Sequence, residues 1–153
     1  MRSLFGLSFL LCVVFGTWVP KNREEICKDR KECIKEANLS KSNLDLVMQD
    51  AFGAEFPLND ELNRYIYCMG EKSELWEMGT MDANIDRVYE VFHALGYDVN
   101  KDDLEKCFVP IFDVSYYVWA GRSIKCLWDK KLIRRKAGCS CGNESTATGQ
   151  HAK

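Results

Sequence analysis

The stretch NIDRVYEVFHALG, residues 84–96, carries the clearest secondary-structure pattern in the chain. Its apolar side chains recur at helical spacing, at Ile85, Val88, Tyr89, Phe92 and Leu95. Asn84 is a residue type that caps helix N-termini, and Gly96 is the type that most often follows a helix C-terminus. The stretch therefore predicts an amphipathic helix whose apolar stripe packs against a core.

Upstream of this stretch the same periodicity recurs three times. Asn22 and Glu25 form a capping-box pair that predicts a first helix. A second helix is expected over residues 42–53. A third is expected to begin at Asp60, to carry Trp76 on its inner face and to end at Gly79.

Downstream, two further helices are expected, and the alternation typical of strands appears nowhere. Asn100 caps a fifth helix, which Pro110 should kink or end. Asp113 or Ser115 begins a sixth, which reaches Trp128. The fold class is therefore predicted to be all-α, a compact domain of six helices.

Residues 1–16 have the composition of a secretory signal peptide. A basic residue near the start precedes an apolar run from Leu4 to Phe15, and a glycine follows. The run is shorter than the roughly 20 apolar residues that span a bilayer. We expect residues 17–137 to form the domain, residues 138–153 to form an irregular tail, and the protein to be secreted and extracellular.

Charge and histidine content exclude several functions. The chain has 23 acidic and 21 basic residues, which disfavours a nucleic-acid partner. Two histidines, His93 and His151, provide little for catalysis, so we expect no enzyme, no metal and no cofactor. The basic run Lys130 to Lys136 is interpreted as a solvated helix terminus, with a docking patch for a protein or an anionic membrane as the alternative.

The cysteines are typical of an exported chain. One of the eight, Cys12, lies in the expected signal peptide, so an odd number remains. At least one thiol is then free or pairs between chains, which leaves monomer and dimer both open. Cys139 and Cys141 could join His151 at a zinc ion, but disulfides are favoured.

The cysteine spacing resembles that of the insect odorant-binding proteins, the pheromone and general odorant-binding family. Cys33 lies in the sequence CIKEANLS, which resembles the first-cysteine helix of that family. The family's six cysteines have three residues between the second and third and eight between the fifth and sixth. Here Arg64 stands four positions before Cys68, and Tyr117 stands nine positions before Cys126. Loss of both positions resembles the four-cysteine "minus-C" subgroup.

The resemblance implies two disulfides, Cys33–Cys68 and Cys107–Cys126. Cys27 is then expected to pair with Cys139 or Cys141, and spacing does not choose between them. Asn38 and Asn143 each fit the glycosylation acceptor pattern, without showing that either is modified.

The resemblance also implies that the six helices form a disulfide-braced domain around an apolar cavity. Such a domain would carry small hydrophobic molecules such as odorants or pheromones, with a chemosensory receptor as a candidate partner. The alternative is a secreted helical protein that binds another protein or an anionic membrane surface. Matching positions to the family's motif and to the helix stripes predicts these ligand-binding residues: Ile66, Met69, Leu75, Trp76, Val88, Phe92, Leu104, Tyr116, Trp119, Ala120 and Leu127.

Overall fold

The computed structural model describes residues 18–48 and 57–135. Within these ranges the chain forms six helices and two short strands: α1 (Arg23–Glu36), α2 (Lys41–Met48), α3 (Asp60–Lys72), α4 (Ile85–Ala94), β1 (Tyr97–Asp98), α5 (Lys101–Cys107), α6 (Tyr116–Asp129) and β2 (Arg134–Arg135). The all-α class with six helices is confirmed. The expected signal peptide, residues 1–16, and the expected tail, residues 138–153, lie outside the described residues.

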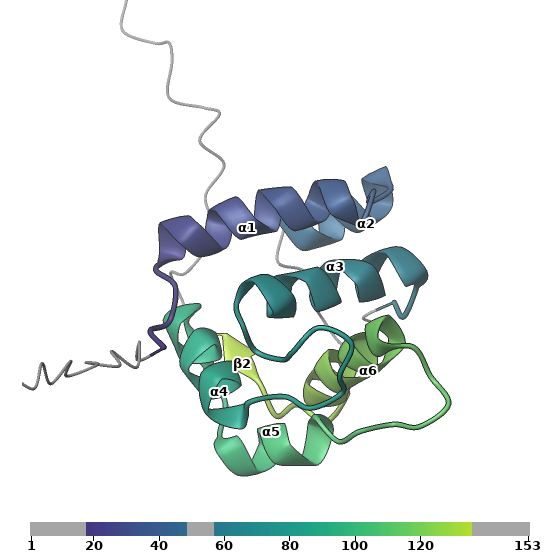
Figure 1. Cartoon of the computed structure of the whole chain (residues 1–153). Coiled ribbons are helices and arrows are strands. Elements are labelled where there is room, and N and C mark those ends of the chain that lie inside the picture. Colours follow the sequence, from purple (N-terminus) through teal and green to yellow (C-terminus); the bar gives the residue numbers. More distant parts are fainter. Residues whose placement is uncertain (1–17, 49–56, 136–153) are drawn as a thin grey trace, which may run out of the picture.

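The helices are arranged around α3. Figure 1 shows α1 lying along one side of α3, α6 on its other side, and α4 and α5 together at the opposite end of the molecule from α2. The contact between α3 and α6 is the most extensive between any two described elements, followed by that between α1 and α3. A core therefore forms where α3 meets the other helices.

Side-chain caps fix where the helices begin. Asn22 and Glu25 form the predicted capping box, in which each side chain accepts a hydrogen bond from the other residue's backbone N–H, at 3.0 and 2.9 Å. Asn84 and Asn100 cap α4 and α5 as predicted. Of the two candidates for α6, Ser115 is the cap. Each cap accepts a bond from a backbone N–H that has no partner within its helix.

The third helix ends earlier than predicted. The sequence prediction continued it past Trp76 to Gly79, whereas α3 ends at Lys72. Glu74 adopts a left-handed backbone with φ of 55°, and the N–H of Leu75 donates to the carbonyl of Gly70 at 2.8 Å. This is a Schellman turn, which usually has glycine in the left-handed position. Because a glutamate occupies this position, nothing in the sequence indicated the end of the helix, and the prediction extended the helix along the apolar pattern for seven residues too many.

Two short strands were not predicted. Tyr97 pairs with Arg135, and Asp98 pairs with Arg134, in an antiparallel ladder. Strands of two residues are too short to show any alternation in sequence. Two residues of the basic run Lys130 to Lys136 belong to these elements. Lys130 is the C-cap of α6, and Arg134 lies in β2. Lys136 lies outside the described residues.

Two disulfides brace the helices as the resemblance implied. Cys33 joins Cys68 between α1 and α3, and their Cα atoms are 5.7 Å apart. Cys107 joins Cys126 between α5 and α6, with Cα atoms 5.6 Å apart. Cys27 is also disulfide-bonded. Its expected partners, Cys139 and Cys141, lie outside the described residues, as do Asn143 and His151.

The packing between α3 and α6 depends on one tryptophan and one glycine. Trp119 is fully buried, and its indole N–H donates to the carbonyl of Val109 at 2.9 Å, which fixes the loop before α6. Gly121 lies against α3 so closely that a Cβ there would overlap the side-chain amide of Asn63. Glycine at this position leaves the space on α6 that the Asn63 side chain of α3 occupies.

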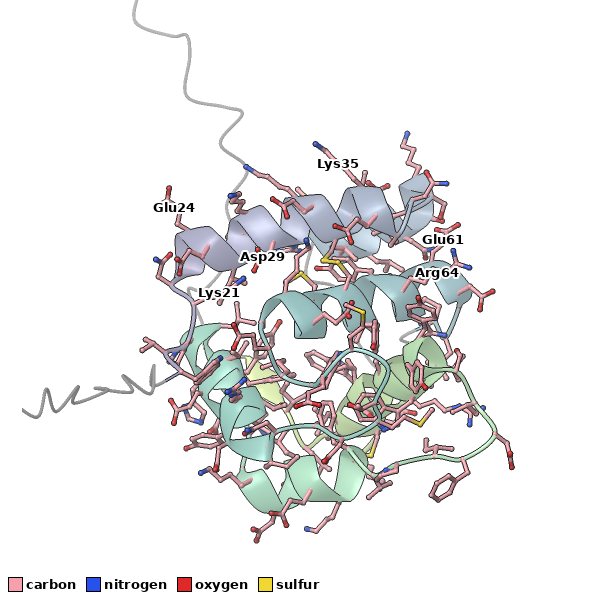
Figure 2. The ribbon with its side chains drawn as sticks, in the orientation of Figure 1. Lys21, Glu24, Asp29, Lys35, Glu61 and Arg64 are labelled. Carbon is pink, nitrogen blue, oxygen red and sulfur yellow. A yellow bond between two sulfur atoms is a disulfide. The ribbon has the colours of Figure 1, made fainter. Side chains whose placement is uncertain are left out.

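A polar network joins α2 to α3 on the outside of the core. The Glu61 carboxylate accepts from the backbone N–H of Ser40 and from the amide of Asn43, both at 2.7 Å. Asn43 also exchanges side-chain hydrogen bonds with Asn59, the N-cap of α3. Figure 2 shows Glu61 at the end of α3 next to α2. The hydrogen bond from Ser40, followed by that from Asn43, lowers the pKa of Glu61.

Because the folded pKa is below the unfolded one, Glu61 should stabilise the fold above the unfolded pKa and lose this effect as pH falls through the folded pKa. We expect Glu61→Gln to lower the free energy of unfolding at pH 7, and the difference from wild type to shrink towards pH 3. Urea unfolding at both pH values measures it. Glu105→Gln, at an exposed position of α5, is the control and should change stability little at either pH. A wild type-to-Gln difference that is constant with pH would contradict the role given to the carboxylate.

Candidate functional site: an apolar cavity

The interior holds an apolar cavity of about 140 Å³. It lies where α3, α4 and α6 converge, and residues from α1, β1 and the end of α5 complete its wall. The lining residues are Ile26, Tyr65, Ile66, Met69, Gly70, Ser73, Leu75, Trp76, Val91, Phe92, Leu95, Tyr97, Phe108, Ile124 and Trp128. None of them carries a formal charge, so the cavity suits uncharged, largely apolar molecules.

The turn after α3 builds one wall of the cavity. The Schellman turn reverses the chain, so that Leu75 and Trp76 fold back onto the helix they follow. Gly70 makes this possible, because a Cβ at that position would overlap the six-membered ring of the Trp76 indole. Trp76 is consequently 6% exposed although it lies in a loop.

The loop over residues 73–83 is held to the core at several points. The backbone N–H of Asn84 donates to the carbonyl of Leu75 at 2.8 Å, and Trp76 forms an isolated antiparallel bridge with Ala83. The hydroxyl of Tyr67 accepts from the N–H of Gly79 at 2.9 Å, and burial raises the pKa of that hydroxyl. Trp76 is therefore a fixed wall of the cavity rather than a loose surface group.

Ion pairs hold α1 against the rest of the domain. Lys72 of α3 contacts Glu32 and Glu36 of α1, at 3.0 and 3.1 Å. The hydrogen bond from Lys72 lowers the pKa of Glu32. Lys21 contacts the buried Asp29 at 2.5 Å, and Figure 2 shows this pair on the inner side of α1. The Lys72 pairs and the Cys33–Cys68 disulfide join α1 to α3, whereas the Lys21–Asp29 pair joins α1 to the segment just before it.

Five of the predicted ligand-binding residues lie in the cavity wall: Ile66, Met69, Leu75, Trp76 and Phe92. Three elements bring them together, namely α3, the turn after it, and α4. Their contact with a ligand stays a prediction.

Five more lie in solid core instead of the wall: Val88, Leu104, Trp119, Ala120 and Leu127, all fully buried. They support the lining residues from behind. Tyr116 is 42% exposed and lies on an open groove between the loops over residues 79–82 and 110–116, away from the cavity. None of these six residues lines the cavity, and their contact with a ligand stays a prediction.

Sequence reasoning missed several wall residues, for two reasons. Leu95 was in the predicted apolar stripe but was not selected as a ligand contact, whereas Val91, three positions after Val88, was left out of the stripe although its spacing fits it. Gly70, Ser73 and Tyr97 reach the wall through the Schellman turn and the short strand pair, neither of which was predicted. These residues could be predicted only if the turn after α3 and the pairing of β1 with β2 were already known.

A helical domain of this size, braced by disulfides around a partly open apolar cavity, has an architecture that suits the binding of a small hydrophobic molecule. The profile of the PBP/GOBP family matches residues 16–130, and the chain belongs to this family, that of the insect odorant-binding proteins. Its members are secreted binding proteins for small hydrophobic ligands. The two disulfides fit the minus-C subgroup, which stays a prediction. No curated protein matches the chain, and no described helix is long and apolar enough to cross a membrane.

The contact between Gly70 and Trp76 gives a test of how the wall is built. Gly-to-Ala in a helix normally stabilises by up to about 1 kcal/mol. We expect Gly70→Ala to destabilise the protein instead, because the new methyl group displaces the indole. In a Trp76→Leu background the same substitution should cost much less, and a double-mutant cycle from urea unfolding measures the coupling. Equal effects in both backgrounds would show that the ring does not lie against Gly70.

Proposed function

We propose that the protein is a non-catalytic carrier, which takes up small hydrophobic molecules such as odorants or pheromones in an extracellular fluid and releases them to a chemosensory receptor. One observation carries the proposal: the partly open, uncharged cavity lined mainly by α3, α4 and α6. Apolar cavities bind apolar ligands in preference to water.

The disulfides support this function by holding the walls in place. Cys33–Cys68 fixes α1 on α3, and Cys107–Cys126 fixes α5 on α6, so four of the six helices are cross-linked in pairs. A wall that is already ordered before binding loses less entropy when the ligand enters. Affinity can then come from burying a small apolar surface.

Displacement of a fluorescent apolar probe from the refolded protein tests the proposal. The disulfides must first be verified by mass spectrometry. We expect saturable probe binding that volatile alcohols, aldehydes, esters and aromatic compounds displace. A well-folded protein that binds neither probe nor volatile compounds would overturn the carrier function. Binding to anionic vesicles that is lost at high salt would then favour the alternative of a membrane-binding helical protein.

A variant that fills the cavity tests whether binding occurs there. Met69 lies in the wall, and the larger side chain of Met69→Trp should occupy part of the free volume. We expect probe affinity to fall at least about ten-fold, since the ligand loses the apolar surface it would bury, while helicity measured by circular dichroism is retained. Met48→Trp is the matched control, because Met48 is exposed on α2 and is not a lining residue. An equal loss of affinity in both variants would place the binding site elsewhere.

A further inference from the structure

The turn between α1 and α2 carries a modification pattern that the carrier function does not use. Asn38, Leu39 and Ser40 form the acceptor sequence for attachment of a glycan to asparagine, and neither Leu39 nor the following Lys41 is proline. Patterns of three residues recur by chance in many sequences. The exposure and the backbone of this turn therefore decide whether the pattern can be used.

The structure presents the asparagine of this pattern to solvent. Asn38 is exposed, whereas Ala37 before it is buried and Leu39 after it packs against the core. The two apolar neighbours hold the turn to the domain, and the asparagine between them stays accessible. A bulky group attached to Asn38 can therefore extend into solvent without disturbing the core.

The backbone of the turn permits an asparagine but does not require one. The φ angle of Asn38 is 51°, in the left-handed region, and its N–H donates to the carbonyl of Lys35 at 3.1 Å. Asparagine tolerates this conformation better than most residues, but glycine is the residue that most often ends a helix in this way. The turn also gives no reason for a hydroxyl two positions later.

The third residue of the pattern is held mainly by its backbone. The N–H of Ser40 donates to the carboxylate of Glu61 at 2.7 Å, and any residue other than proline could donate the same bond. Ser40 is exposed, and its hydroxyl lies 3.3 Å from that of Ser42, which is also exposed. The acceptor pattern, in contrast, needs serine or threonine at this position.

A glycan on Asn38 would lie at the end of α1 that is away from the cavity. The cavity residue that α1 contributes is Ile26, near the start of the helix. The stretch from Ile26 to Glu36 extends about 15 Å along the helix axis, and Asn38 lies beyond it. Figure 1 shows this end of α1 next to α2 and far from α4. The glycan would therefore add bulk to the surface without filling the cavity.

We propose that Asn38 is a site of N-linked glycosylation in the secreted protein. An oligosaccharyltransferase transfers an oligosaccharide from a lipid-linked diphosphate donor. The bond between the anomeric carbon and the diphosphate oxygen breaks, and a bond between that carbon and Nδ2 of Asn38 forms. One amide proton leaves, and the lipid diphosphate is the leaving group. The inference rests on the proposed extracellular function, because only chains that enter the secretory pathway meet this enzyme.

Expression of the full chain in cultured insect cells tests the site. Protein from the medium should lose mass when a peptide N-glycosidase releases the glycan and converts Asn38 to aspartate. Peptide mapping by mass spectrometry assigns the position and separates it from Asn143. An exported protein that is unmodified at Asn38, or modified at Asn143 alone, would overturn the inference and leave the carrier function standing. A chain that stays in the cytosol with residues 1–16 uncleaved would overturn both.

Variants separate the modification from the structure of the turn, in an Asn143→Gln background that leaves one acceptor. Asn38→Gly suits the left-handed backbone, and Ser40→Ala keeps the N–H that Glu61 accepts. Each should abolish the glycan and the gel-mobility shift it causes, while the protein is still exported. Ser42→Ala is the matched control, because it removes the other hydroxyl of the pair outside the pattern and should keep the shift. A shift that persists in the first two variants would overturn the site.

Removal of the glycan by the glycosidase also tests where it lies. Affinity for the fluorescent probe should be the same before and after removal, since Asn38 and Ile26 lie near opposite ends of α1. A change in probe affinity after removal would overturn the placement of the glycan away from the cavity.

Discussion

The close packing of α3 against α6 is the constraint on which the rest of the domain depends. Gly121 leaves room on α6 for the Asn63 side chain of α3, and Trp119 is fully buried beside this contact while its indole N–H holds the loop before α6. Both helices carry a disulfide to another helix, α3 to α1 and α6 to α5. A shift at this one contact would therefore move every pair of cross-linked helices and alter the cavity between them.

One wall of the cavity is formed by the turn that ends α3 rather than by a helix. A continuous third helix would have carried Trp76 away along its axis. The left-handed backbone at Glu74 instead turns the chain, and Gly70 receives the indole. This wall of the cavity is thus made by one residue in a strained backbone conformation, Glu74, and one position without a side chain, Gly70, on a scaffold that is otherwise regular. This division is common in proteins whose sites lie on loops above a rigid frame.

The sequence was sufficient for the regular parts of this structure. The side-chain caps Asn22, Asn84 and Asn100 predicted the helix starts correctly, because a cap depends only on residues within three or four positions of each other. The disulfides came from family resemblance. What could not be predicted depends on tertiary contact: the left-handed turn at Glu74, the pairing of Tyr97 with Arg135, and the wall position of Ser73. A stripe of apolar residues shows that a face is buried, but it does not show whether that face meets a cavity or solid core.

The order of the two described disulfides along the chain affects how the protein is made. Cys33–Cys68 spans 35 positions and Cys107–Cys126 spans 19, and the two loops neither overlap nor interlock. Each can close as soon as its own segment has been synthesised, and neither has to wait for the other. The first bond can form between α1 and α3 while α5 and α6 are still on the ribosome. Neither of these two bonds therefore requires the other to form first, and an order that follows the direction of synthesis is open to them.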